Sequence, residues 1–133
     1  MGRIDPFIRE LTSDEPVLNW FGMTIVEAHA GMATITLTVD PHQVNGNRMA
    51  HGGVVFAVAD QAFAMAANTL LHYAATADAT IQYLAPSRAG DLLTARARTT
   101  YHDDRRAVVD VEVVTADRVV AIYRGTARAT RRG

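Results

Sequence analysis

The longest apolar run of the chain, residues 51–72, lacks the polar face that a surface helix would show. It opens on two glycines, continues from Val54 to Ala59 without a polar side chain, and then places one acid, Asp60, among apolar residues. Alanine dominates the run and proline is absent from it, so the composition favours helix. A helix that is apolar on nearly every side must be wrapped by other elements. We expect the rest of the chain to supply that wrapping.

The apolar positions alternate with a period of two on either side of this helix. Residues 23–27 and 33–39 are two short β-rich runs with a glycine-containing turn between them, which predicts a hairpin. Four further β-type runs follow the helix, at residues 79–84, 91–101, 107–115 and 119–129. Residues 3–11 and 17–20 are expected to form short helical turns, and residues 131–133 a frayed tail.

This order of elements, two strands, one long helix and four strands, limits the fold. No second long helix is available to cross over between parallel strands, so the sheet is expected to be mostly antiparallel. An antiparallel sheet covers one face of a helix, and a second copy of the chain is the simplest cover for the rest. We predict one α+β domain over residues 1–133 that associates with itself.

Composition narrows the class of protein. The chain has 133 residues, a net charge of -1 at pH 7 and no cysteine. These values exclude thiol nucleophiles and disulfides, and they give no reason to expect nucleic acid as a partner. Asp60, Gln61 and Asn68 interrupt the apolar run, so no membrane span is expected. The N-terminus is too polar for a signal peptide, and we expect a cytoplasmic protein.

Three features near the start of the helix could carry chemistry. Gly52 and Gly53 would leave backbone N–H groups open to an oxyanion at the positive end of the helix dipole, although a tight loop before a packed helix needs the same glycines. Asp60 would be a buried carboxylate with no basic residue within four positions, so it is either a reactive group or the structural partner of an arginine on a strand. Asn45, which precedes Gly46, could be only a turn residue.

Motifs for other kinds of chemistry are missing. The five histidines show no metal-ligand spacing, and the chain has neither a serine nucleophile elbow nor a phosphate-binding glycine loop. His51, directly before the helix, is expected to anchor the loop by bonding backbone groups. No metal site is therefore expected.

The candidate residues together resemble one known family, the hot-dog-fold acyl-CoA thioesterases of the phenylacetate-degradation (PaaI) type. The resemblance covers nearly the whole chain and rests most specifically on Asn45-Gly46, His51-Gly52-Gly53 and Ala59-Asp60. It implies a six-stranded antiparallel sheet wrapped around one long central helix, in dimers that pair into tetramers. It also implies no cofactor other than the coenzyme A that forms part of the substrate.

The resemblance also implies a role for each matching residue. Asp60 would be the general base or nucleophile, the Gly52 N–H would polarise the carbonyl, and Asn45 would orient the thioester or the attacking water. Four further residues are expected to bind substrate: His51, Gly53, Phe56 and Phe63. The acyl group is expected near Trp20 and Phe21, and the coenzyme A phosphates near surface arginines, for which the candidates are Arg88, Arg105, Arg106 and Arg124.

Helix geometry adds an independent constraint. Gly52 and Asp60 are eight residues apart, about 12 Å along a helix axis, whereas one carbonyl must lie within hydrogen-bond reach of its oxyanion donor and of its base. We therefore expect each site to take Gly52 and Asn45 from one chain and Asp60 from another. The expected substrate is an aryl-acyl-CoA of the phenylacetyl type or a short to medium acyl-CoA. A non-catalytic acyl-CoA-binding protein and a hot-dog dehydratase or hydratase are the alternatives.

Overall fold

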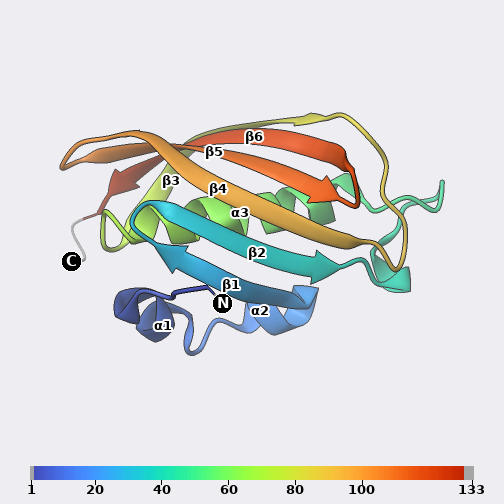
Figure 1. The fold of residues 1–133 in the computed structure, drawn as a ribbon, viewed down its shortest axis with the longest axis horizontal. Coiled ribbons are helices and arrows are strands. Elements are labelled where there is room, and N and C mark those ends of the chain that lie inside the picture. Colours follow the sequence, from blue (N-terminus) through green and yellow to red (C-terminus); the bar gives the residue numbers. More distant parts are fainter. Residues whose placement is uncertain (1, 131–133) are drawn as a thin grey trace.

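One antiparallel sheet of six strands curves around one long helix (Figure 1). The computed structural model describes residues 2–130, so the tail expected at residues 131–133 lies outside the described residues. In chain order the elements are α1 (Pro6–Thr12), α2 (Pro16–Phe21), β1 (Met23–His29), β2 (Met32–Thr38), the 3₁₀ turn η1 (Pro41–Gln43), α3 (Gly52–Asn68), β3 (Ala74–Tyr83), β4 (Leu92–His102), β5 (Arg106–Thr115) and β6 (Arg118–Ala129). The predicted α+β class and the predicted order of strands and helix are confirmed.

The strands lie in the order β1-β2-β4-β5-β6-β3, and each neighbouring pair is antiparallel. Alternation along each strand sends one set of side chains toward the helix. On β4 and β5 these inward side chains are buried: Leu93, Ala95, Ala97, Val109, Val111 and Val113. The opposite face of the sheet is polar, and Arg124 of β6 pairs there with Asp110 of β5. The period-two alternation predicted for residues 91–101 and 107–115 is therefore confirmed.

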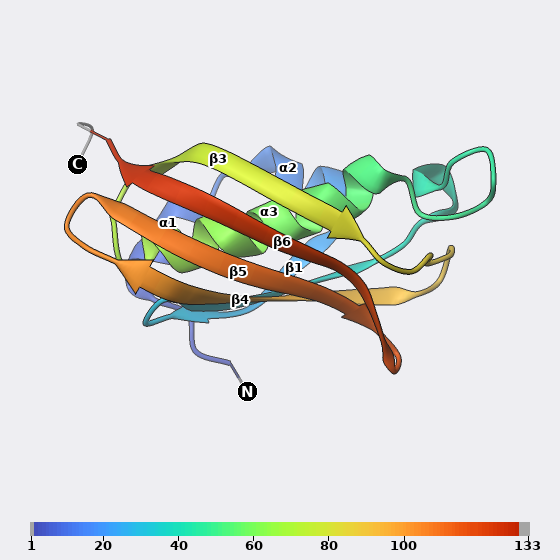
Figure 2. The same ribbon diagram turned by 90° about the horizontal axis from the view of Figure 1, so that it is seen from above.

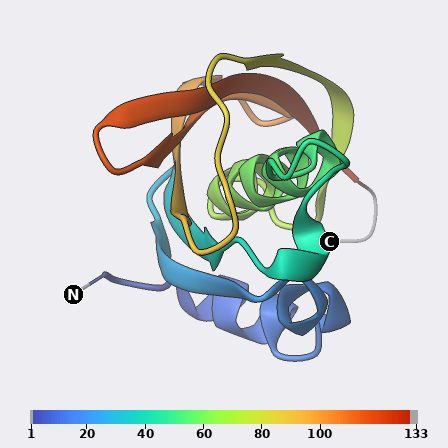
Figure 3. The same ribbon diagram turned by 90° about the vertical axis from the view of Figure 1, so that its right-hand side faces the viewer.

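The inner face of the sheet covers most of the circumference of α3, as the end-on view in Figure 3 shows. The helix ends at Asn68 rather than at residue 72. It ends there because the Asn68 side chain accepts the N–H of Ala74 at 2.9 Å and the Thr69 hydroxyl accepts the N–H of Gly31 at 2.7 Å, which turns the chain. No helix in the described part of the chain has the length and apolar character needed to cross a membrane.

One face of α3 stays open in the single chain. Its members are spaced three and four residues apart, as neighbours on one face of a helix are. All are partly or fully exposed: Gly53, Phe56, Ala57, Asp60 and Ala64. We refer to these residues as the open stripe. Its presence agrees with the expectation that one sheet does not cover the whole helix.

The two edges of the sheet differ in what covers them. At the β1 edge, the N–H of Ala28 donates to the carbonyl of Arg3 and the N–H of Asp5 donates to the carbonyl of Ala28, both at 2.8 Å. At the other edge, β3 pairs with β6, and within residues 2–130 no strand lies on its outer side (Figure 2). An edge of unpaired backbone groups favours pairing with another chain.

The start of β3 was predicted wrongly. The strand begins at Ala74 and not at residue 79. Residues 74–78 are rich in alanine and largely exposed, so their own sequence carries no β pattern. They are extended because they pair with β6, where Ala74 lies opposite Ala129. Pairing with a distant strand thus overrides a weak local preference.

Candidate active site

The first turn of α3 leaves one backbone N–H group free. His51 is the N-cap of the helix, and its Nδ1 accepts the N–H of Gly53 at 2.9 Å. The N–H of His51 itself donates to the carbonyl of Gln43 at 2.8 Å. The N–H of Gly52 has no acceptor among residues 2–130, so it is available to an anion at the positive end of the helix dipole. His51 thus anchors the loop as expected.

Gly52 lies in the wall of a cavity of about 390 Å³ between the start of α3 and the end of β3. The hydroxyl of Tyr83, which lines the same cavity, donates to the carbonyl of Gly52 at 2.9 Å. This bond fixes the first peptide group of the helix from its carbonyl side. The Gly52 N–H belongs to the preceding peptide group, between His51 and Gly52.

Asn45 lines the same cavity. Its Oδ1 accepts the N–H groups of Asn47 at 2.9 Å and Met49 at 3.2 Å, so Asn45 does hold the turn, as the simpler interpretation required. Its Nδ2 has no acceptor within the described chain, and an amide keeps two donors there. Asn45 can therefore hold the loop with one end of its side chain and a ligand with the other.

Asp60 lies on the open stripe and is half-buried, so the expectation of a fully buried acid is wrong for the single chain. The hydroxyl of Tyr123 donates to its Oδ1 at 2.7 Å. The arginine partner considered from the sequence is thus absent in the described chain, and a tyrosine of β6 takes its place. The Oδ2 of Asp60 has no partner within residues 2–130, and it is not among the buried unpaired polar atoms there.

Tyr123 was not identified from the sequence. It is buried, and both this burial and the adjacent Asp60 carboxylate raise the pKa of Tyr123 above its usual range. The phenol therefore keeps its proton and acts as the donor. A signal was available, because alternation along β6 directs Ala121, Tyr123 and Gly125 toward α3, where a phenol needs a polar partner.

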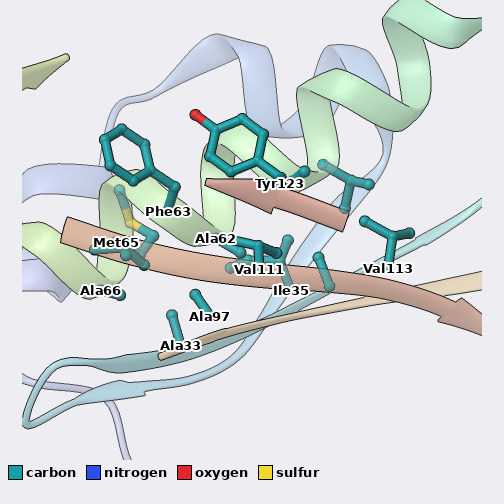
Figure 4. Close-up of a cluster of buried hydrophobic side chains, with 14 of the residues drawn as sticks. Ala33, Ile35, Ala62, Phe63, Met65, Ala66, Ala97, Val111, Val113 and Tyr123 are labelled. Atoms are coloured by element: carbon teal, nitrogen blue, oxygen red, sulfur yellow. The ribbon is translucent and has the colours of Figure 1, made fainter. Parts of the chain in front are cut away.

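The other predicted substrate contacts fall in different places. Gly53 and Phe56 lie on the open stripe, and the Phe56 ring stands edge-on to Tyr123 with 5.6 Å between ring centroids. Phe63 is only 1% exposed, because it packs in the core beside Tyr123 (Figure 4) and against Gly125. In the single chain Phe63 is therefore a core residue, and its contact with substrate stays a prediction.

Two further surfaces correspond to predicted contacts. Trp20 is 79% exposed and lines, with Phe21 and His51, a cavity of about 600 Å³ on the other side of the helix start. Arg124 forms a two-point pair with Asp110, at 2.5 and 2.8 Å, on the outer face of the sheet. Within residues 2–130 no cluster of histidine and acidic side chains could hold a metal ion.

The structure thus brings Gly52 and Asn45 together and keeps Asp60 apart from them. Asp60 does not line their cavity, and it lies more than two turns, about 12 Å, farther along α3. An oxyanion donor and a reactive carboxylate are both present, but one chain does not direct them at one point.

Comparison with known proteins identifies relatives over most of the chain. A family profile described as the thioesterase superfamily matches residues 47–122. The chain is 38% identical over 105 residues to the acyl-coenzyme A thioesterase PaaI of Escherichia coli (strain K12), a match that covers 78% of this chain and 75% of the relative. The structure of the E. coli PaaI protein from the phenylacetic acid degradation operon superposes with a TM-score of 0.89 at 32% identity, covering 92% of this chain and 89% of that one.

A hypothetical thioesterase protein from Streptococcus pneumoniae, solved with coenzyme A, superposes with a TM-score of 0.77 at 25% identity. That match covers 81% of this chain and 88% of the other. These likenesses confirm the hot-dog fold, in which the sheet wraps around the central helix.

Proposed function

The chain belongs to the thioesterase superfamily and is an acyl-CoA thioesterase, and we propose that two copies of it share each active site. Gly52 and Asn45 of one copy would bind the thioester carbonyl, and Asp60 of the other would supply the carboxylate. The observation that carries this proposal is the free N–H of Gly52, which shares a cavity with Asn45 but not with Asp60.

The reaction needs one carboxylate and one oxyanion donor. Asp60 would take a proton from water while the water oxygen bonds to the carbonyl carbon, or it would attack that carbon itself and form an anhydride that water then cleaves. In both routes the carbonyl oxygen becomes negative and accepts the Gly52 N–H. Collapse of the adduct breaks the C–S bond, and the coenzyme A thiolate leaves and takes a proton. An intact-mass measurement after rapid quenching separates the routes, because only the second adds the acyl group to the chain.

The surface around Asp60 supports a second copy as the source of the missing half. The open stripe exposes apolar and small side chains on a helix that is otherwise buried. Strand β3 is an edge strand, with no strand on its outer side among residues 2–130. Two chains packed there would cover both features and continue the sheet from one copy into the other.

The substrate class follows the relatives at a coarse level. We propose a coenzyme A thioester of an arylacetic acid or of a short to medium chain acid. The E. coli relative is named an acyl-coenzyme A thioesterase, and its origin in a phenylacetic acid degradation operon favours the arylacetic acid. Release of free coenzyme A from a panel of phenylacetyl-, hydroxyphenylacetyl-, butyryl- and octanoyl-CoA tests the activity and ranks the acyl groups. Binding without release of thiol would favour a non-catalytic acyl-CoA-binding protein.

Mixed dimers test the shared site. Asp60→Asn and Asn45→Ala chains are refolded together in equal amounts, and the residual activity of each pure variant is subtracted. Random pairing makes about half of the dimers mixed, and each mixed dimer has one intact site, so activity should recover to about a quarter of wild type. No recovery, with mixed dimers verified by mass, would show that both residues serve the same chain.

A reversed mixture provides the control. The double variant Asp60→Asn/Asn45→Ala is refolded with an equal amount of wild-type chain. A shared site predicts about a quarter of the wild-type rate, because only pure wild-type dimers work, whereas a site within one chain predicts about a half. Compared with a site within one chain, a shared site therefore raises the activity of the first mixture and lowers the activity of the second.

A further inference from the structure

Tyr123 is a buried residue whose hydroxyl reaches the carboxylate to which we assign the chemistry. We propose that Tyr123 is a positioning residue: it holds Oδ1 of Asp60 in place and thereby leaves Oδ2 as the oxygen that reacts. This inference rests on the proposed role of Asp60. It adds a group from β6 that never touches the substrate.

The contact has the geometry of a strong hydrogen bond. The Tyr123 hydroxyl lies 2.7 Å from Oδ1 of Asp60, a length typical of a hydroxyl that donates to an ionised oxygen. Oδ2 has no partner in the described chain, so the two oxygens of Asp60 differ: one is fixed and the other is presented on the open stripe.

The tyrosine is itself held rigidly. Its side chain is 3% exposed. The rings of Phe56 and Phe63 both contact it, each with its centroid 5.6 Å from that of Tyr123. Figure 4 shows the hydroxyl pointing away from the aliphatic side chains of the core, which include Val111 and Ile35. A hydroxyl on so constrained a ring offers one position to its acceptor.

Such a support matters because the carboxylate stands on a half-exposed face. Without a partner an aspartate side chain rotates among several conformers, whereas a base or nucleophile must be held close to one geometry. Asp78 of β3 is the other ionisable group that acts on Tyr123, while the neighbouring Arg124 is directed to Asp110 on the outer face.

The test compares two tyrosine-to-phenylalanine variants. Tyr123→Phe removes the hydroxyl and keeps the ring. Tyr101→Phe is the matched control, because the Tyr101 hydroxyl also donates to an aspartate, Asp103, at 2.8 Å, but on an exposed turn. Both variants are assayed for kcat and KM by release of free coenzyme A, after circular dichroism has shown that they are folded.

We expect Tyr123→Phe to lower kcat roughly tenfold through loss of orientation, with KM changed less than twofold. A purely structural role would lower stability and leave the kcat of the folded variant unchanged. If kcat matches that of Tyr101→Phe, Tyr123 does not position Asp60.

Asp60→Asn separates failure of this inference from failure of the proposed function. Wild-type turnover in Asp60→Asn would refute the role of Asp60 itself, and with it the basis for positioning. An inactive Asp60→Asn beside an unaltered Tyr123→Phe would refute positioning alone. If Tyr123→Phe does not fold, the ¹³C resonance of the Tyr123 carbon that bears the hydroxyl is measured in Asp60→Asn. This resonance should shift, and the pKa of the Tyr123 phenol should fall, because Asp60 raises it. An unchanged resonance overturns the proposal.

Discussion

Replacing Gly52 with proline should remove the proposed oxyanion donor while leaving the backbone unchanged. Gly52 is the first residue of α3, where proline is accepted because this N–H has no acceptor within the helix. The preceding residue, His51, has φ -62° and ψ 139°, which lies in the extended region that a residue before proline prefers. We therefore expect Gly52→Pro to fold and to lose activity.

The size of the loss follows from the chemistry of the site. Removing one donor from an oxyanion hole lowers kcat by about 10²–10³, equivalent to about 2.7–4 kcal/mol of transition-state stabilisation. Gly52→Ala is the matched control, because it adds a Cβ at the same place and keeps the N–H. That Cβ would lie 3.3 Å from the Tyr83 hydroxyl oxygen, and Tyr83 is 52% exposed and free to shift by a few tenths of an ångström.

The assay is the release of free coenzyme A, with folding checked by circular dichroism and thermal melting. Gly52→Ala should keep kcat within about threefold of wild type, since an adjustment at an exposed side chain usually changes energies by about 0.5 kcal/mol or less. Gly52→Pro should fall at least about a hundredfold below Gly52→Ala. Equal rates in the two folded variants would reduce Gly52 to a packing glycine and remove the free N–H from the mechanism.

Two further predictions concern the sheet. In Gly125→Ala the new Cβ would lie 2.7 Å from the Phe63 ring, well inside the about 3.5 Å that carbon atoms prefer. Urea unfolding should show a loss of about 1–3 kcal/mol in the free energy of unfolding. Adding Phe63→Leu should restore part of it. The hydrogen bond from Arg124 lowers the pKa of Asp110 in the folded protein. The Asp110 carboxylate therefore stabilises the fold at any pH above its pKa in the unfolded chain. This stabilisation is lost as the pH falls through the lower pKa of the folded protein. Asp110→Asn should thus lower the melting temperature at pH 7 but not at about pH 2, and an equal decrease at both would contradict the ion pair.

Local periodicity was sufficient to predict most of the fold. The inward positions of β4 and β5, the hairpin of β1 and β2, and the long helix each carry their own repeat of apolar residues. What escaped prediction depends on contacts between distant segments. The first half of β3 is extended only because β6 lies beside it.

The site divides in the same way. The Asn-Gly and HGG motifs identify the helix start from the sequence alone because all of their residues are close together in the chain. The partner of Asp60 could not be found by that route, since Tyr123 lies 63 residues away and only the register of β6 brings it near. Alternation along β6 is consistent with an inward tyrosine, but nothing local relates that tyrosine to Asp60.

The open stripe makes the arrangement of the two helices testable. If Asp60 of each copy serves Gly52 of the other, the two-fold axis passes near the midpoint of these positions, beside residue 56, and the helices run antiparallel. Ala57 of the two copies would then be offset by about 3 Å along the axis and Ala64 by about 24 Å. Helix axes 8–10 Å apart bring facing Cα atoms within the about 4.4–6.8 Å that a disulfide spans.

The chain contains no cysteine, so single substitutions report this geometry cleanly. Ala57→Cys should form a covalent dimer under mild oxidation, and Ala64→Cys, the same change on the same stripe, should not. Cross-linking of Ala64→Cys in preference to Ala57→Cys would place the two-fold axis elsewhere along α3. Asp60 of one copy would then lie away from Gly52 of the other, and the shared site would have to be abandoned even if the protein proved to be a dimer.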